Sequence, residues 1–256
     1  MRSGLVAGMA IVIVGCEPPS APAVATPPLT TVVFDESHAV SDATVLAKAD
    51  VRILFIGNSQ TSHHNLPDLV CRMLRHARPG KTVAHHVVGV AHLDDASINP
   101  QVKAEIEFRP WTHVVLQAQK ISMSGKVLYS TDVGIDLAKR AKVRGVAVSY
   151  FAEWARKGEA EERERTEAIY AGMAKEAGAS VIPVGRAWDA AFAKRPDLPL
   201  HEVDGNHESA MGAYLTACVI AGRLSGIAPL QFVTVDFADL STGDRTFLAE
   251  VAGQIK

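Results

Sequence analysis

The sequence predicts an α/β fold, a three-layer αβα sandwich in which helices cover both faces of a parallel sheet of five strands. Two observations carry this prediction. Short segments that are almost wholly apolar alternate with longer segments of helical periodicity, which is typical of parallel βαβ units. The apolar segments also suit strands that are buried on both faces.

Five segments have the composition of such strands. Residues 52–57 form an apolar run that stops at Gly-Asn-Ser, and residues 82–90 are rich in β-branched side chains. The other three are residues 111–116, 144–150 and 180–184. The carboxyl ends of parallel strands share one edge of the sheet, where α/β proteins bind their ligands, so the loops at this edge are expected to hold the site.

Helical patterns separate these strands. In residues 66–77 apolar side chains recur every three or four positions, as on one face of a helix. Shorter patterns predict helices at residues 104–108 and 136–141. Residues 159–177 form a long charged amphipathic helix, and residues 209–224 are predicted as the closing helix.

Composition excludes several classes of protein. Among the 256 residues, 48% are hydrophobic and 21% charged, which excludes wholesale disorder. The formal net charge of −2 gives no basic field for a nucleic-acid partner. Three cysteines are too few for a scaffold built on disulfides.

The N-terminal segment has the pattern of an export signal. One arginine precedes about ten apolar residues, fewer than the roughly 20 needed to span a bilayer. The segment ends Ile-Val-Gly-Cys at Cys16, which resembles the lipobox of bacterial lipoproteins. This resemblance implies cleavage before Cys16 and a lipid on that cysteine, with an ordinary signal peptide as the alternative.

We therefore divide the chain into a lipoprotein signal peptide (residues 1–15), the lipidated Cys16 with a proline-rich tether (16–49) and a folded domain (50–256). Residues 32–49 have no clear pattern, and we predict no structure for them. The expected location is outside the cytoplasm, anchored by lipid to a bacterial membrane on its periplasmic face or at the cell surface.

Ser59 is the candidate nucleophile. It follows the first predicted strand, where backbone amides can converge on an anion. Gly-Asn-Ser is also common turn chemistry, so Ser59 alone is weak support for catalysis. The chain lacks both a Gly-x-Ser-x-Gly elbow and a phosphate-binding loop of the Gly-x-x-x-x-Gly-Lys type.

A candidate general base lies just before the last predicted helix. His207 can accept the proton of a serine near neutral pH, and Asp204 can orient the imidazole from three residues away. The alternative for Asp204 or Ser209 is a helix cap, which is compatible with catalysis by a neighbour.

Gly57-Asn58-Ser59 together with Asp204-x-x-His207 resembles the SGNH (GDSL-type) hydrolase superfamily, over about residues 52–226. The resemblance implies a flavodoxin-like αβα sandwich with Ser59 as nucleophile, His207 as general base and Asp204 as its orienting partner. Glu208 stands where relatives often carry proline.

The resemblance also implies an oxyanion hole. Its donors are the amide of Ser59, the glycine after the second strand, here Gly89, and an asparagine after the third strand. This sequence has no Gly-x-Asn there, so Gln117 or Gln119 is the expected substitute, and we favour Gln119. Loss of one such donor typically lowers the rate about 100- to 1000-fold.

Other chemistry-bearing residues receive weaker interpretations. We predict no metal site, although five histidines were considered as ligands: His63, His64, His85, His86 and His92. A disulfide between Cys71 and Cys218 is left open. Trp154 and Trp188 are either sugar-stacking platforms or core residues.

The sequence thus predicts a monomeric serine esterase that acts through an acyl-enzyme without cofactor or metal. The expected substrate is a small-molecule or glycan ester, with O-acetylated carbohydrate as the candidate. The alternatives are a non-catalytic glycan-binding lipoprotein and an acyltransferase on the same fold. A nucleic-acid partner is not expected.

Overall fold

The computed structural model describes residues 43–122 and 124–255. At its centre lies a sheet of five parallel strands in the order β2-β1-β3-β4-β5, which confirms the predicted fold class. The strands are β1 (Val51–Gly57), β2 (Val83–Gly89), β3 (His113–Leu116), β4 (Ala147–Ala152) and β5 (Ser180–Pro183). The predicted signal peptide, Cys16 and the tether up to residue 42 lie outside the described residues.

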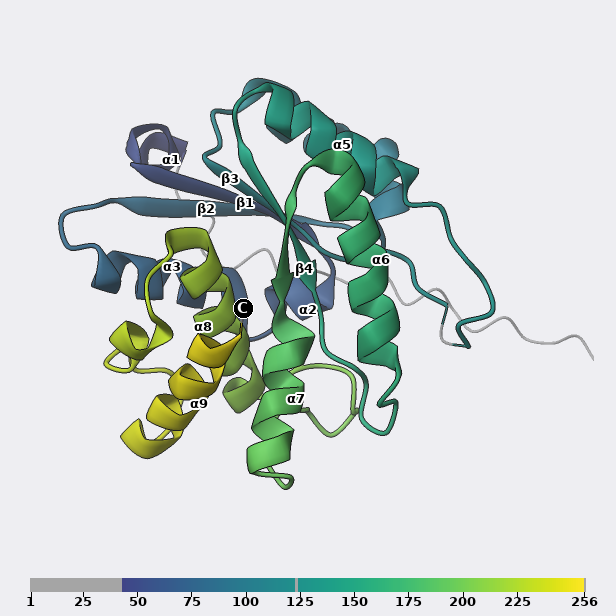
Figure 1. Cartoon of the computed structure of the whole chain (residues 1–256). Coiled ribbons are helices and arrows are strands. Elements are labelled where there is room, and N and C mark those ends of the chain that lie inside the picture. The colour runs from purple at the N-terminus through teal and green to yellow at the C-terminus, as the bar shows by residue number, and fades with distance from the viewer. Residues whose placement is uncertain (1–42, 123, 256) are drawn as a thin grey trace, which may run out of the picture. The chain divides into compact units, whose positions relative to one another are not determined.

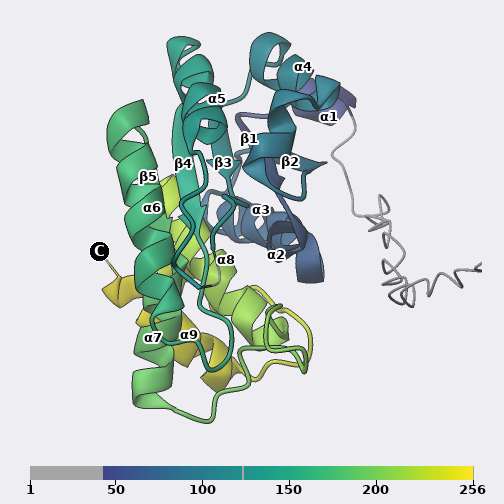
Figure 2. The same cartoon turned by 90° about the vertical axis from the view of Figure 1, so that its right-hand side faces the viewer.

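Helices form the two outer layers of the sandwich. Helices α3, α7, α8 and α9 cover one face of the sheet, and α4, α5 and α6 cover the other (Figure 1). Figure 2 shows α5 and α6 side by side. The helices are α1 (Ala43–Lys48), α2 (Ser59–Ser62), α3 (Leu66–Ala77), α4 (Pro100–Phe108), α5 (Asp132–Val143), α6 (Glu162–Ala177), α7 (Val184–Lys194), α8 (Ala210–Ser225) and α9 (Thr242–Gln254), joined by the short 3₁₀ helices η1 (His63–Asn65), η2 (Leu93–Ser97) and η3 (Pro229–Phe232).

The surroundings of strand β1 explain why both of its faces are apolar. Ile53 and Phe55 enter the core under α3 and α8, whereas Leu54 and Ile56 enter the core under α4 and α5. All four side chains are completely buried. Because each such burial contributes about 1.5–3 kcal/mol, the strand that carries Ser59 at its end is held firmly in place.

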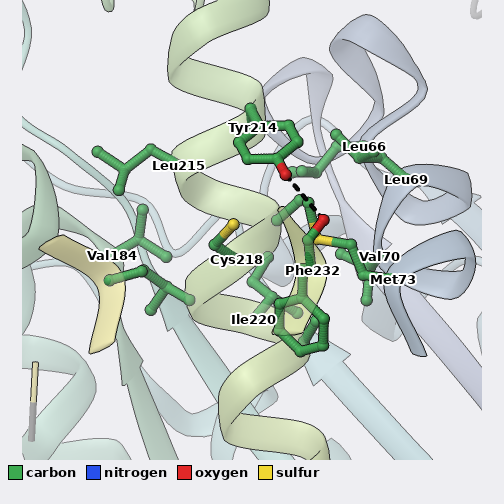
Figure 3. Close-up of a cluster of buried hydrophobic side chains, with 14 of the residues drawn as sticks. Leu66, Leu69, Val70, Met73, Val184, Tyr214, Leu215, Cys218, Ile220 and Phe232 are labelled. Atoms are coloured by element: carbon green, nitrogen blue, oxygen red, sulfur yellow. Dashed lines mark hydrogen bonds between the residues drawn. The ribbon is translucent and has the colours of Figure 1, made fainter. Parts of the chain in front are cut away.

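Helix α8, which follows His207, is fixed by its contact with α3. Side chains of this core cluster are drawn in Figure 3: Leu66, Leu69, Val70 and Met73 from α3, and Tyr214, Leu215, Cys218 and Ile220 from α8, with Leu215 on the side of α8 next to Val184. The Tyr214 hydroxyl donates a hydrogen bond of 2.9 Å to the carbonyl of Phe232. This packing holds α3 and α8 side by side, and with them the chain segments that precede each helix.

Cys71 and Cys218 are both free and buried, so the disulfide that the sequence left open is not formed. Burial raises the pKa of the Cys71 thiol to about 12, because a thiolate is poorly solvated in an apolar core. Both cysteines are therefore unreactive core residues.

Four helices were not predicted. The one-turn helix α2 lies in the stretch that was interpreted as a loop after the first strand. Helix α7 starts where β5 ends, so no loop separates the two patterns. Helix α9 buries the charged residue Arg245 together with apolar residues, which weakens its periodic pattern. Helix α1 lies in the stretch without a predicted structure. In the described part of the chain, no helix combines the length and apolar character that a bilayer crossing requires.

Candidate active site

Ser59 lies at the carboxyl edge of the sheet, at the start of α2. Strand β1 ends at Gly57, and Asn58 caps α2 by accepting a hydrogen bond of 3.0 Å from the amide of Gln60. Asn58 therefore ends the strand and begins the helix, which places Ser59 in the first helical turn, where amides have no partner within the helix.

The segment before α8 folds into a tight turn that presents His207. Gly205 adopts a left-handed φ of 69°, and the amide of Glu202 donates to the carbonyl of His207 at 2.8 Å. One carboxylate oxygen of Asp204 accepts the amides of Asn206 and His207, at 2.9 and 3.0 Å. Asp204 thus organises the turn as well as facing the imidazole.

The structure brings Ser59, His207 and Asp204 into one chain of hydrogen bonds. The Ser59 Oγ lies 2.8 Å from His207 Nε2, and His207 Nδ1 lies 2.5 Å from the second oxygen of Asp204. The hydrogen bonds from His207 and from the two backbone amides hold the pKa of Asp204 well below its ordinary value. Asp204 is therefore a carboxylate over the whole working pH range.

The helix cap that the sequence offered as an alternative belongs to Ser209. Its Oγ accepts a hydrogen bond of 3.2 Å from the amide of Gly212 in the first turn of α8. Asp204 makes its hydrogen bonds within the turn instead. Capping and the His207 contact are thus divided between two residues.

Gly89 lies at the same edge as Ser59. It ends β2 directly opposite Gly57, and the amide of the next residue, Val90, donates to the Gly57 carbonyl at 2.9 Å. Gly89 itself is exposed. Gly89 therefore ends the strand next to the one that Ser59 follows.

The structure does not show Gln119 in the expected donor role. The Gln119 side-chain amide donates to the carbonyls of Ser130, at 2.9 Å, and of Lys120, at 3.4 Å. The chain reverses at Ala118, which has a left-handed φ of 79°. Because of this change of direction after β3, Gln117 and Gln119 have different surroundings. Gln119 fixes the loop before α5 through its hydrogen bond to Ser130.

Gln117 is the glutamine beside Ser59, but it braces the nucleophile loop. Its carbonyl oxygen accepts hydrogen bonds from the Asn58 amide, at 3.0 Å, and the Thr61 hydroxyl, at 2.8 Å. Its amide donates a hydrogen bond of 3.2 Å to the side-chain oxygen of Gln60. Gln117 therefore links Asn58, Gln60 and Thr61 in the loop that carries Ser59.

Glu153 is a site residue that the sequence analysis missed. It directly follows β4, and its carboxyl group is buried close to Tyr170 and Gln117. Burial raises its pKa to about 7, because the charged form is poorly solvated there. An acidic residue right after a buried strand, at the edge expected to hold the site, was the signal that could have revealed it.

The side chain of Trp154 makes a hydrogen bond to the turn that carries His207. Its indole Nε1 donates to the carbonyl of Asn206 at 3.0 Å, and its ring stacks on Trp188 at 4.3 Å between centroids. Both indoles are almost completely buried core residues, and both also form part of the wall of a neighbouring cleft. This cleft of about 850 Å³ borders the turn beside Glu202 and Val203, and its lining includes neither Ser59 nor His207.

Two further histidines adjoin the site. The ring of His63 lies 5.2 Å from that of His207, and the Nε2 of His64 lies 3.1 Å from a carboxylate oxygen of Glu202. Burial, together with His64 and His207 nearby, lowers the pKa of His63.

No protein-family model and no curated protein matches the sequence. Solved structures do. A candidate SGNH hydrolase from Slackia heliotrinireducens is 24% identical, with 68% of this chain and 99% of that chain aligned and a TM-score of 0.55. The chain has the SGNH hydrolase fold. A DUF4886 family protein from Bacteroides uniformis is 14% identical over 79% of this chain and 93% of that chain, with a TM-score of 0.60. A lipase/acylhydrolase from Enterococcus faecalis is 16% identical, with 69% of this chain and 96% of that chain aligned and a TM-score of 0.51.

In this SGNH hydrolase fold, the end of β1 has no room for a side chain. A Cβ at Gly57 would overlap the Thr61 hydroxyl and lie 2.7 Å from the carbonyl oxygen of Gln117. We expect Gly57→Ala to displace both side chains and to lower the free energy of unfolding by about 1–3 kcal/mol, measured by urea denaturation. The matched control is Gly172→Ala on α6, where a Cβ meets nothing within 4 Å and a gain of up to about 1 kcal/mol is expected. Equal losses in the two variants would contradict this account.

Proposed function

We propose that the protein is a serine hydrolase that cleaves ester bonds. The single observation that carries the proposal is the hydrogen-bonded chain from Ser59 Oγ through His207 to Asp204. Ser59 is 148 positions from His207 in the sequence. Neither the packing of the core nor the capping of a helix requires these side chains to meet. The likeness of fold to a lipase/acylhydrolase agrees with this function.

The reaction follows from these contacts. His207 Nε2 takes the proton of Ser59 Oγ as the oxygen attacks the ester carbonyl, and Asp204 stabilises the imidazolium that forms. His207 then gives this proton to the departing alkoxide, which leaves an acyl group on Ser59. Water, deprotonated by His207, releases the acid and restores the serine.

The negative oxygen of the tetrahedral intermediate needs donors that are already in place. We assign this role to the backbone amides of Ser59 and Gly89, which lie at the ends of neighbouring strands. Gln117 acts as a positioning residue, because its hydrogen bonds to Asn58 and Thr61 fix the loop that carries Ser59.

As substrate we propose a short acyl ester, with O-acetyl groups on carbohydrate as the class to examine first. We further propose that the protein works outside the cytoplasm, anchored through a lipid on Cys16, as the pattern of residues 1–16 predicts.

A fluorophosphonate probe tests the proposal, because it reacts only with an activated serine. The Ser59 oxygen displaces fluoride from phosphorus, and His207 takes the serine proton. We expect stoichiometric labelling of Ser59 on the intact protein, measured by mass spectrometry of its peptides. Labelling should vanish in Ser59→Ala and persist in Ser62→Ala, a matched control in the same short helix. A folded protein that stays unlabelled would overturn the hydrolase assignment and favour the glycan-binding alternative.

A further inference from the structure

A cluster of three metal-binding side chains lies at the rim of the site. His63, His64 and Glu202 each present one ligand atom, and these atoms all lie within 4.8 Å of one another. The closest pair is His64 Nε2 and Glu202 Oε1, at 3.1 Å. Glu202 is 138 positions from His64 in the sequence, so the fold itself brings the glutamate to the two adjacent histidines.

The backbone between α2 and α3 explains how neighbouring histidines reach the same place. His64 has φ 49° and ψ 20°, and Asn65 has φ 54°. Both residues therefore adopt the left-handed backbone conformation, which residues other than glycine rarely adopt. In an extended strand, adjacent side chains point to opposite sides. The reversal instead brings the two rings together, with 4.5 Å between their centroids.

The donor set favours a zinc-like cation. Imidazole nitrogen and carboxylate oxygen are ordinary zinc ligands, and three protein ligands that leave a fourth position open are typical of accessible zinc sites. Tetrahedral bonds of about 2.0–2.2 Å place ligand atoms roughly 3.3–3.5 Å apart. The His64–Glu202 pair is already close to this separation, and His63 needs only a small side-chain movement.

We propose that His63, His64 and Glu202 bind one Zn²⁺ ion and that the bound ion inhibits hydrolysis. The ring of His63 lies 5.2 Å from that of His207. Glu202 belongs to the turn that presents His207, so an ion that joins it to His63 and His64 ties this turn to the segment after Ser59 and restrains the imidazole there. The inhibition rests on the proposed function, whereas the binding of zinc does not.

Isothermal titration with Zn²⁺ tests the binding, using the full chain and its Ser59→Ala variant. We expect one equivalent of zinc in both proteins, and affinity at least about 10-fold weaker in His64→Gln and in the isosteric Glu202→Gln. His76→Gln is the matched control, because His76 is exposed on α3 and bonded to Thr234, away from the cluster. Thermal melts check that each variant is folded. Absence of binding by the wild type, or unchanged affinity in both cluster variants, would overturn the site.

Ester hydrolysis tests the second half of the proposal. We expect Zn²⁺ to inhibit the wild type and His76→Gln at the same concentrations, and to inhibit His64→Gln and Glu202→Gln only at concentrations at least about 10-fold higher. Mg²⁺, which prefers oxygen ligands alone, should have no effect at these concentrations. Zinc binding without any hydrolysis by the wild type would reject the proposed function and leave the site intact. Hydrolysis that saturating zinc does not change would reject the inhibition.

Discussion

Replacing His207 by alanine is expected to lower kcat for a short acyl ester such as p-nitrophenyl acetate by about 10⁴-fold or more, with little change in KM. The structure gives Ser59 Oγ one side-chain base, His207 Nε2 at 2.8 Å. Without it, the serine must lose its proton to water, and the leaving alkoxide has no acid to protonate it. Losses of roughly 10⁴- to 10⁶-fold are typical when one member of such a unit is removed.

Three controls make this result specific. The double variant Ser59→Ala/His207→Ala should be no slower than either single variant, because the two groups act as one unit. His76→Ala, which removes an exposed histidine on α3, should keep the wild-type rate. Circular dichroism verifies folding. A His207→Ala protein that retains more than about one tenth of the wild-type kcat would show that another group activates Ser59.

Replacing Glu208 by glutamine is expected to raise the free energy of unfolding by about 2–4 kcal/mol at pH 8 and to change it little at pH 5. The Glu208 side chain is completely buried, and within the described residues neither carboxylate oxygen has a hydrogen-bond partner. Burial, aided by the nearby negative charges of Glu202 and Asp204, raises its pKa to about 9.

The direction follows from the difference between the folded and unfolded pKa. Because the folded pKa of Glu208 lies above the unfolded value, the folded state binds the proton more tightly. Stability is complete below the unfolded pKa of about 4.3 and falls as the pH rises toward 9, where the unfolded chain releases that proton and the folded protein does not. Glutamine carries no ionisable proton, so this loss disappears.

Urea denaturation of the wild type, Glu208→Gln and Glu250→Gln between pH 5 and pH 8 measures the effect. Glu250 is exposed on α9, so its variant should follow the wild-type curve at every pH. Parallel curves for the wild type and Glu208→Gln would show that the Glu208 carboxyl group is solvated or paired in solution. A gap that widens with pH supports the buried neutral acid.

The layout of the sheet could be predicted because buried parallel strands have a simple local signature. Runs such as residues 52–57 must be apolar on both sides, and each ends near the edge where ligands bind. Helices α7 and α9 could not be predicted in this way. Helix α7 continues directly from a strand, and α9 buries Arg245 among its apolar residues. The buried faces of both helices are set by their contact with α8.

The candidate site was predictable only in part. Ser59, Asp204 and His207 stand out by residue type and spacing, and the structure places them within hydrogen-bonding distance. The sequence could not decide which of Gln117 and Gln119 lies beside Ser59. That outcome depends on the positive φ of Ala118 and on hydrogen-bond acceptors in distant segments.

The sequence by itself determined the alternation of strands and helices and the identity of one hydroxyl, one imidazole and one carboxylate with complementary chemistry. Only the tertiary structure decided which polar side chains share their surroundings. Glu153 lies near Gln117 because β4 pairs with β3, the strand that Gln117 follows. Glu202 lies against His64 because the turn before α8 packs against the segment after α2. Burial and charge at such points are sums over segments far apart in the chain, so no local pattern of residues encodes them.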